Sequence, residues 1–117
     1  IPGWVEGTLT KDFWDINPPD GEPYRTPKAE SRQQILEVFD TNVAAAHKAI
    51  AAASDVEFMK EWSLLSGGQT YFTMPRIAVI RSFVLNHTIH HRAYLGSYLR
   101  LNDIPIPGMY GPSGDEE

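Results

Sequence analysis

Two histidines, His87 and His91, have the residue type and spacing that could do chemistry in this chain. On an α-helix, four residues of separation place two side chains on one face, about 40° apart and one turn above the other. Paired imidazoles of this kind typically form the helical half of a transition-metal site. No glutamate follows His87, so the pair lacks the general base of the His-Glu-x-x-His metalloproteases. We therefore expect a metal-binding pair, and a pair of purely structural, hydrogen-bonded histidines is the alternative.

The pair must be positioned by a long helix, which the pattern predicts over residues 75–101 with Pro75 in its first turn. Apolar residues and the two histidines recur there on one narrow stripe, so both imidazoles are expected to face the core. Three further side chains are candidates for contacts with the ligands or with a substrate, namely His90 on the adjacent flank, Tyr94 on the same face, and Arg92. The stripe comprises Ile80, Val84, His87, His91, Tyr94 and Tyr98.

A catalytic metal needs about three protein ligands and one open position. The chain has no cysteine, so any ligands must be nitrogen or oxygen atoms. His47 lies on a second predicted helix, residues 31–53, about 60–70° from the centre of its apolar stripe. We expect His47 to be a boundary histidine rather than a ligand. Three sources of a third ligand stay open: His47 in spite of its boundary position, a carboxylate, or a residue outside this chain.

The remaining segments are shorter and less regular. Ser31 is a predicted cap for the helix over 31–53, and residues 1–10 read as a short helical piece. Prolines make residues 15–30 a long loop. Around Ser66-Gly67-Gly68-Gln69 we expect a small hairpin. The chain as a whole, residues 1–117, is expected to form a single domain.

The overall charge and hydropathy exclude some classes of function. The net charge of −5 argues against nucleic-acid binding. Four arginines and no acid lie between residues 75 and 102; we expect these arginines to pair with acids elsewhere, and an attraction for an anionic substrate is the alternative. No apolar run is long enough for a membrane span, so a cytoplasmic location is the default.

Several segments together resemble the DinB family of DinB/YfiT-like proteins, which are named for damage-inducible genes. The match covers most of the chain and is most specific from residue 73 to 116. The segments that carry it are Ile1-Pro2-Gly3-Trp4, Thr73-Met74-Pro75-Arg76, Asn86-His87-Thr88-Ile89-His90-His91-Arg92, Tyr98-Leu99-Arg100-Leu101 and Pro105-Ile106-Pro107-Gly108-Met109-Tyr110-Gly111-Pro112-Ser113.

The resemblance implies an all-α fold, a four-helix bundle that is incomplete here, with two long helices, a short N-terminal helical piece and long loops. It also implies a divalent metal, nickel or zinc, held by three histidines. Two of these match His87 and His91, and the third would lie upstream of Ile1, in an N-terminal part that this chain is expected to lack. Similar proteins include metal-dependent hydrolases and thiol-dependent transferases, so a small-molecule substrate and a low-molecular-weight thiol are implied, while the catalytic residues stay unassigned.

Missing helices would leave apolar helix faces uncovered. We therefore expect a homo-oligomer, in the simplest case a dimer, or association with the chain's own missing N-terminal segment. The alternative to an enzyme is a non-catalytic helical oligomerisation module with structural histidines.

Overall fold

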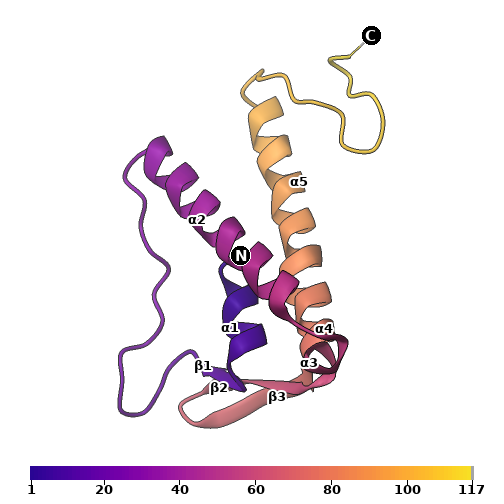
Figure 1. Ribbon diagram of the computed structural model, residues 1–117. Helices are drawn as coiled ribbons and strands as arrows, with labels where there is room; N and C mark the ends of the chain where they lie inside the picture. Colours follow the sequence, from indigo (N-terminus) through magenta and orange to yellow (C-terminus); the bar gives the residue numbers. More distant parts are fainter. Residues whose placement is uncertain (117) are drawn as a thin grey trace.

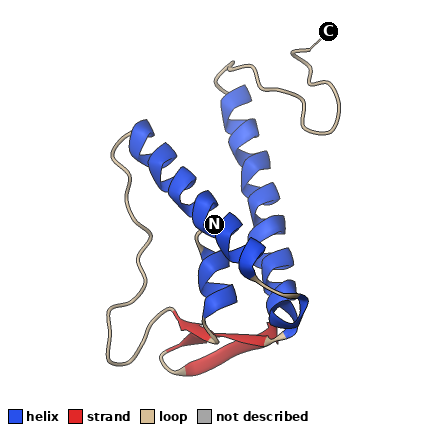
Figure 2. Cartoon of the chain, viewed as in Figure 1, coloured by secondary structure: helices blue, strands red, loops and turns tan. Residues whose placement is uncertain are grey.

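The computed structural model describes residues 1–116 as a mixed α/β structure, in which two long helices diverge from a small sheet at their base (Figure 1). The strands lie together at the base of the structure, and the long helices rise from them (Figure 2). The helices are α1 (Trp4–Thr10), α2 (Arg32–Ala52), α3 (Asp55–Met59), α4 (Arg76–Val79), the π-helix η1 (Ile80–Asn86) and α5 (His87–Arg100). The strands are β1 (Phe13–Asp15), β2 (Glu61–Ser66) and β3 (Gln69–Pro75).

The three-stranded sheet overturns the predicted all-α four-helix bundle. The strand order is β1-β2-β3, with β1 parallel to β2 and β2 antiparallel to β3. The hairpin of β2 and β3 was predicted and is confirmed. β1 was not predicted, because its three residues pair with Ser63–Leu65, about fifty positions further along the chain. Such a parallel pair needs a long crossover connection and leaves no local signal in the sequence.

The carboxylate of Asp15 fastens the hairpin turn to the end of β1. Its Oδ1 accepts hydrogen bonds from the backbone N–H groups of Asn17 (2.9 Å) and Gly67 (3.1 Å). Its Oδ2 accepts another from the N–H of Gly68 (2.7 Å). Both glycines have positive φ angles, 62° and 75°, as a two-residue hairpin turn of the type I′ kind requires. One charged side chain therefore satisfies three turn amides at once.

Replacing Asp15 with alanine is expected to destabilise the fold by about 1–2 kcal/mol, because three backbone donors lose a charged acceptor in a partly exposed site. Urea unfolding followed by circular dichroism measures the change. Asp20→Ala is the matched control, since Asp20 is exposed and makes no hydrogen bond or ion pair among residues 1–116. An equal effect of the two substitutions would contradict the role given to Asp15.

The two long helical segments were predicted and are confirmed. α2 begins after Ser31, whose Oγ accepts a hydrogen bond from the backbone N–H of Gln34 (3.2 Å). The segment predicted over 75–101 is continuous from α4 through η1 to α5, and its middle is a π-helix instead of an α-helix. The short helical piece near the N-terminus is α1.

The hydrophobic core is small and lies where α1 meets α2 and η1. Its buried members are Val5, Leu9, Ala46, Ile80 and Val84. α1 covers the second half of α2, and beyond this contact α2 and α5 separate (Figure 1). Among the helices of residues 1–116, none has the length and apolar character needed to cross a membrane.

Candidate metal site

The two histidines of the predicted pair come from the first turn and a half of α5, directly after the π-helix. η1 is anchored in the core by Ile80 and Val84, both of which are buried. π-Helical turns within longer helices occur frequently at functional sites. His87 is the first residue of α5, so the core contacts of η1 fix the position from which the pair projects.

The imidazoles of His87 and His91 face each other. Their Nε2 atoms are 2.8 Å apart, and their ring centroids are 4.5 Å apart. Without a metal, this distance fits a hydrogen bond in which one Nε2 carries the proton and the other accepts it. The indole of Trp4 lies against His87 with ring centroids 5.5 Å apart, so α1 restricts the orientation of the first ring.

The spacing of the two nitrogens also fits joint coordination of one ion. With ligand bonds of about 2.1 Å, nitrogens 2.8 Å apart subtend an angle of about 84° at a metal. His87 and His91 would hold the ion through these two nitrogens, and the ion would supply a Lewis acid. A metal would take the place of the shared proton and bind two neutral imidazoles.

The three further candidates lie on the same helix but do not converge on the pair. The ring of His90 is 5.0 Å from that of His91 and 6.5 Å from that of His87, and it packs edge-on against Tyr94 at 4.8 Å. Arg92 points elsewhere, with its guanidinium carbon 5.9 Å from the centre of the Tyr110 ring. His90 and Tyr94 therefore form the surroundings of the pair, whereas Arg92 belongs to the contact between α5 and the C-terminal tail.

The predicted metal centre needs correction in two respects. Within residues 1–116, no three side chains of the histidine, aspartate or glutamate type come together as a metal-binding group. His47 lies on α2 and is exposed, in keeping with the boundary position expected for it. The pair was expected to face the core, yet only His87 is half-buried and His91 is exposed, because within residues 1–116 α1 reaches His87 and no element covers His91.

The surroundings of His91 favour its neutral form. Its pKa is lowered, first by desolvation among its neighbours and then by the charges of His87, His90 and the amino group of Ile1. Neutral imidazole is the form that binds a metal, so this electrostatic setting suits the proposed chemistry.

Two of the four arginines pair with acids, as expected. Arg76 forms ion pairs with Glu57 (2.7 Å) and Asp12 (3.1 Å), and Arg100 pairs with Asp115. The ion pairs of Arg76 connect α4 to α3 and to the turn after α1. The ion pair of Arg100 connects α5 to the C-terminal tail, residues 101–116. They support a structural role for the two arginines instead of attraction of an anionic substrate.

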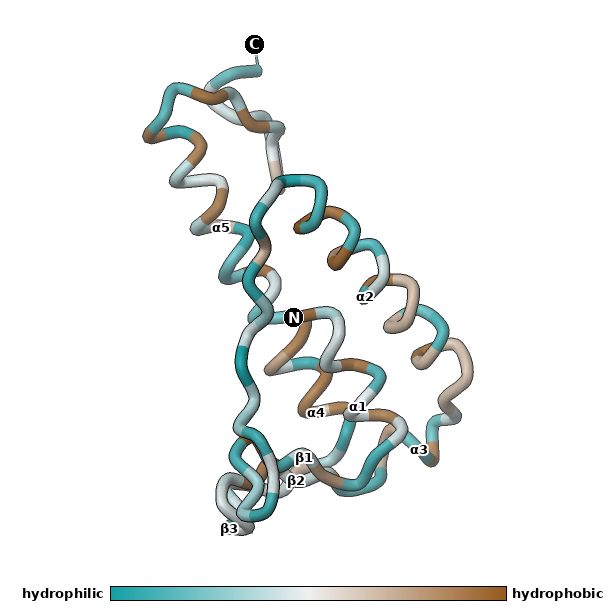
Figure 3. The backbone as a smooth tube through the Cα atoms, turned by 90° about the vertical axis from the view of Figure 1, so that its left-hand side faces the viewer, coloured by the Kyte–Doolittle hydropathy of each residue, from teal (hydrophilic) through white to brown (hydrophobic). Residues whose placement is uncertain are grey.

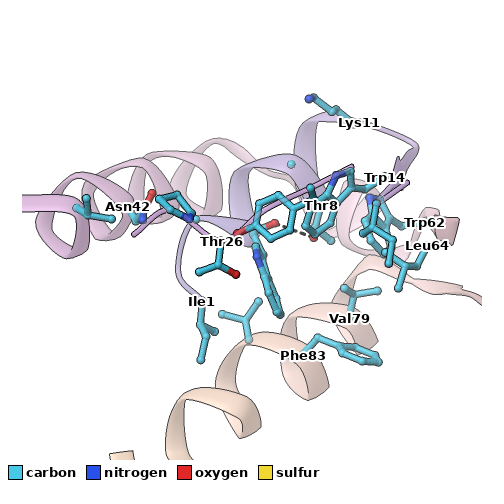
Figure 4. Close-up of a pocket in the computed structure, with 18 of the residues that line it drawn as sticks. Ile1, Thr8, Lys11, Trp14, Thr26, Asn42, Trp62, Leu64, Val79 and Phe83 are labelled. Atoms are coloured by element: carbon cyan, nitrogen blue, oxygen red, sulfur yellow. Dashed lines mark hydrogen bonds between the residues drawn. The ribbon is translucent and has the colours of Figure 1, made fainter. Parts of the chain in front are cut away.

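A large apolar cavity, which neither His87 nor His91 lines, was not predicted. It has a volume of about 1160 Å³ and opens between α1, the sheet, the first half of α2 and η1. Trp14, Trp62 and Leu64 lie at one end and Asn42 at the other, with Val79 and Phe83 along the wall (Figure 4). The buried Nε1 of Trp62 has no hydrogen-bond partner among residues 1–116. The aromatic residues that line the cavity come from segments far apart in the sequence, and the place of Trp14 among them depends on β1, which was not predicted.

Comparison with known proteins gives no relative for the chain: no protein-family model, curated protein or solved structure matches it. The resemblance to the DinB family therefore stays a prediction based on the residues quoted above.

Proposed function

We propose that His87 and His91 together hold a divalent cation, nickel or zinc, and that the chain serves a metal-assisted reaction on a small molecule. The observation that supports this proposal is the 2.8 Å approach of the two Nε2 atoms on one helix face. Bound there, the ion would supply a Lewis acid able to polarise a carbonyl group or to activate a water or a thiol.

The protein groups around the pair would each make a limited contribution. Trp4 packs against His87 and orients its ring. His90 and Tyr94 pack against each other beside the pair and would border a molecule bound there. Two protein ligands leave several coordination positions for water or substrate, so the affinity should be lower than that of a three-histidine site. The resemblance of residues 73–116 to the DinB family favours hydrolysis or thiol-dependent transfer as the class of reaction.

Calorimetric titration of the metal-free chain with nickel or zinc tests the proposal. We expect one ion per chain, and at least about tenfold weaker binding, or about 1.4 kcal/mol, in His87→Ala or His91→Ala. The double variant should give no specific binding. His47→Ala is the matched control, since it removes an exposed imidazole from another helix. Equal binding by the double variant and the wild type would refute the assignment.

A non-catalytic helical module is the second candidate, favoured by the exposure of His91 and of apolar side chains on both long helices. In that case the two histidines only share a hydrogen bond. The same titration separates the candidates, because the module predicts no stoichiometric metal in the wild-type chain.

A further inference from the structure

The chain exposes far more surface than a compact monomer of its size. Its accessible surface is 8931 Å², whereas a folded monomer of 13.1 kDa is expected to expose about 6,400 Å². The radius of gyration is 17.1 Å, compared with about 13.4 Å for a compact domain of this length. The surplus is therefore about 2,500 Å² per chain.

Part of this exposed surface is apolar and lies on the two long helices. The stripe of α2 that is buried at Ala46 by α1 continues uncovered along the first half of the helix. On α5, the face that carries the histidine pair continues as aromatic and aliphatic side chains toward the C-terminal end. Hydrophobic positions recur along both helices (Figure 3). The uncovered residues, each about half exposed or more, are Ile35, Leu36, Val38 and Phe39 on α2, Tyr94, Leu95 and Tyr98 on α5, and Leu101 directly after α5.

The charges beside the two stripes are complementary. Asp40 follows Leu36 by four residues and so borders the α2 stripe, whereas Arg92 precedes Leu95 by three and borders the α5 stripe. Neither Asp40 nor Arg92 forms an ion pair within residues 1–116. Of the two arginines on α5, Arg100 is paired with Asp115, so Arg92 is the cation that this helix offers to a partner.

We propose that a second copy of this chain covers these faces. In a two-fold dimer, α5 of each protomer lies along the first half of α2 of the other, with Asp40 opposite the partner's Arg92. One type of contact then occurs twice and closes the assembly, as two-fold symmetry requires. Four long helices surround a common apolar interior that neither chain can form alone.

The area supports a second copy as the occupant. Obligate dimers bury about 2,000–5,000 Å² in total. Two chains carry a combined surplus of about 5,000 Å², so burying about half of it would give an interface within that range. The uncovered faces are also of the right kind, because obligate interfaces are rich in apolar and aromatic residues.

Light scattering coupled to size exclusion, performed with a chelator so that metal has no influence, tests the proposal. The wild-type chain should have twice the mass of 13.1 kDa. Tyr98→Asp should weaken the dimer at least about hundredfold by placing a charge in the apolar contact. Tyr71→Asp is the matched control on β3 and should leave the dimer intact, since Tyr71 has a similar exposed fraction, 67% compared with 61% for Tyr98.

A charge exchange tests the orientation of the helices. Arg92→Asp alone should weaken association by apposing two acids, and Asp40→Arg in the same chain should restore it. A wild-type monomer at all concentrations would overturn the proposal and leave the faces to another occupant. Open-ended assemblies, or equal dimerisation of the Tyr98→Asp variant, would also overturn it.

Discussion

Replacing Ile80 with alanine is expected to lower the free energy of unfolding by about 2–4 kcal/mol. Ile80 is buried at the start of η1, where it packs with Val5 and Leu9 of α1 and with Val84. The alanine would remove three carbon atoms from the buried core. Domains of ordinary size are stable by only about 5–15 kcal/mol, so the variant should unfold at a clearly lower urea concentration.

Ile89→Ala is the matched control for this prediction. Ile89 lies on the same continuous helical run, two turns after Ile80, but 43% of its surface is exposed. The same change of side chain should therefore cost less than about 1 kcal/mol there. Both variants are measured by urea unfolding at one protein concentration. A similar loss in the two would mean that η1 does not pack as described.

Arg76→Ala is the second substitution with a large expected effect, a loss of about 2–3 kcal/mol. Arg76 is only 3% exposed. Its Nη1 donates to Glu57 (2.7 Å), and its Nη2 donates to the backbone carbonyl of Lys11 (3.0 Å) and to Asp12 (3.1 Å). The variant would leave a cavity and a carbonyl without its donor. We place the loss below that for a fully buried ion pair, because both acids stay in contact with water.

The control for Arg76 is Arg81→Ala, one turn further along and exposed, which should change stability by less than about 0.5 kcal/mol. The pKa of Glu57 gives an additional check. It is lowered, first by the hydrogen bond from Lys60 and also by Arg76. Because the pKa of Glu57 is lower in the folded chain than in the unfolded chain, its ionised carboxylate stabilises the fold at pH values above the ordinary pKa of glutamate. This stabilisation is lost as the pH falls through the lowered pKa. Arg76→Ala should therefore reduce the acid sensitivity of unfolding, and an unchanged pH profile would contradict the pairing.

The long helices could be predicted because their signals are local. The Ser31 cap, the alanine-rich half of α2 and the apolar spacing of residues 75–101 all act within a few turns. The hairpin was predictable from Gly67 and Gly68 for the same reason. β1 was not, because it exists only through pairing with β2. The π-helix was also missed, since a count of 3.6 residues per turn assumes an α-helix throughout.

The candidate site was predicted in part. Four-residue spacing correctly indicated that the rings of His87 and His91 would meet. Their depth could not be predicted, because burial depends on what packs against the helix, and nothing within residues 1–116 covers His91. The aromatic cavity depends on long-range contacts between α1, the sheet and η1, which periodicity along one segment does not contain.

The contact of the first helical turn with the imidazole pair affects how the protein should be purified. Trp4 packs against His87 with ring centroids 5.5 Å apart, and the charge of the Ile1 amino group is one cause of the lowered pKa of His91. An oligohistidine affinity tag fused ahead of Ile1 would bring extra imidazoles to the pair and could complete its coordination shell. Metal uptake by such a fusion would then report on the tag as much as on the protein. A tag fused at the opposite terminus would start beyond the far end of α5 (Figure 1) and would leave the pair to be measured by itself.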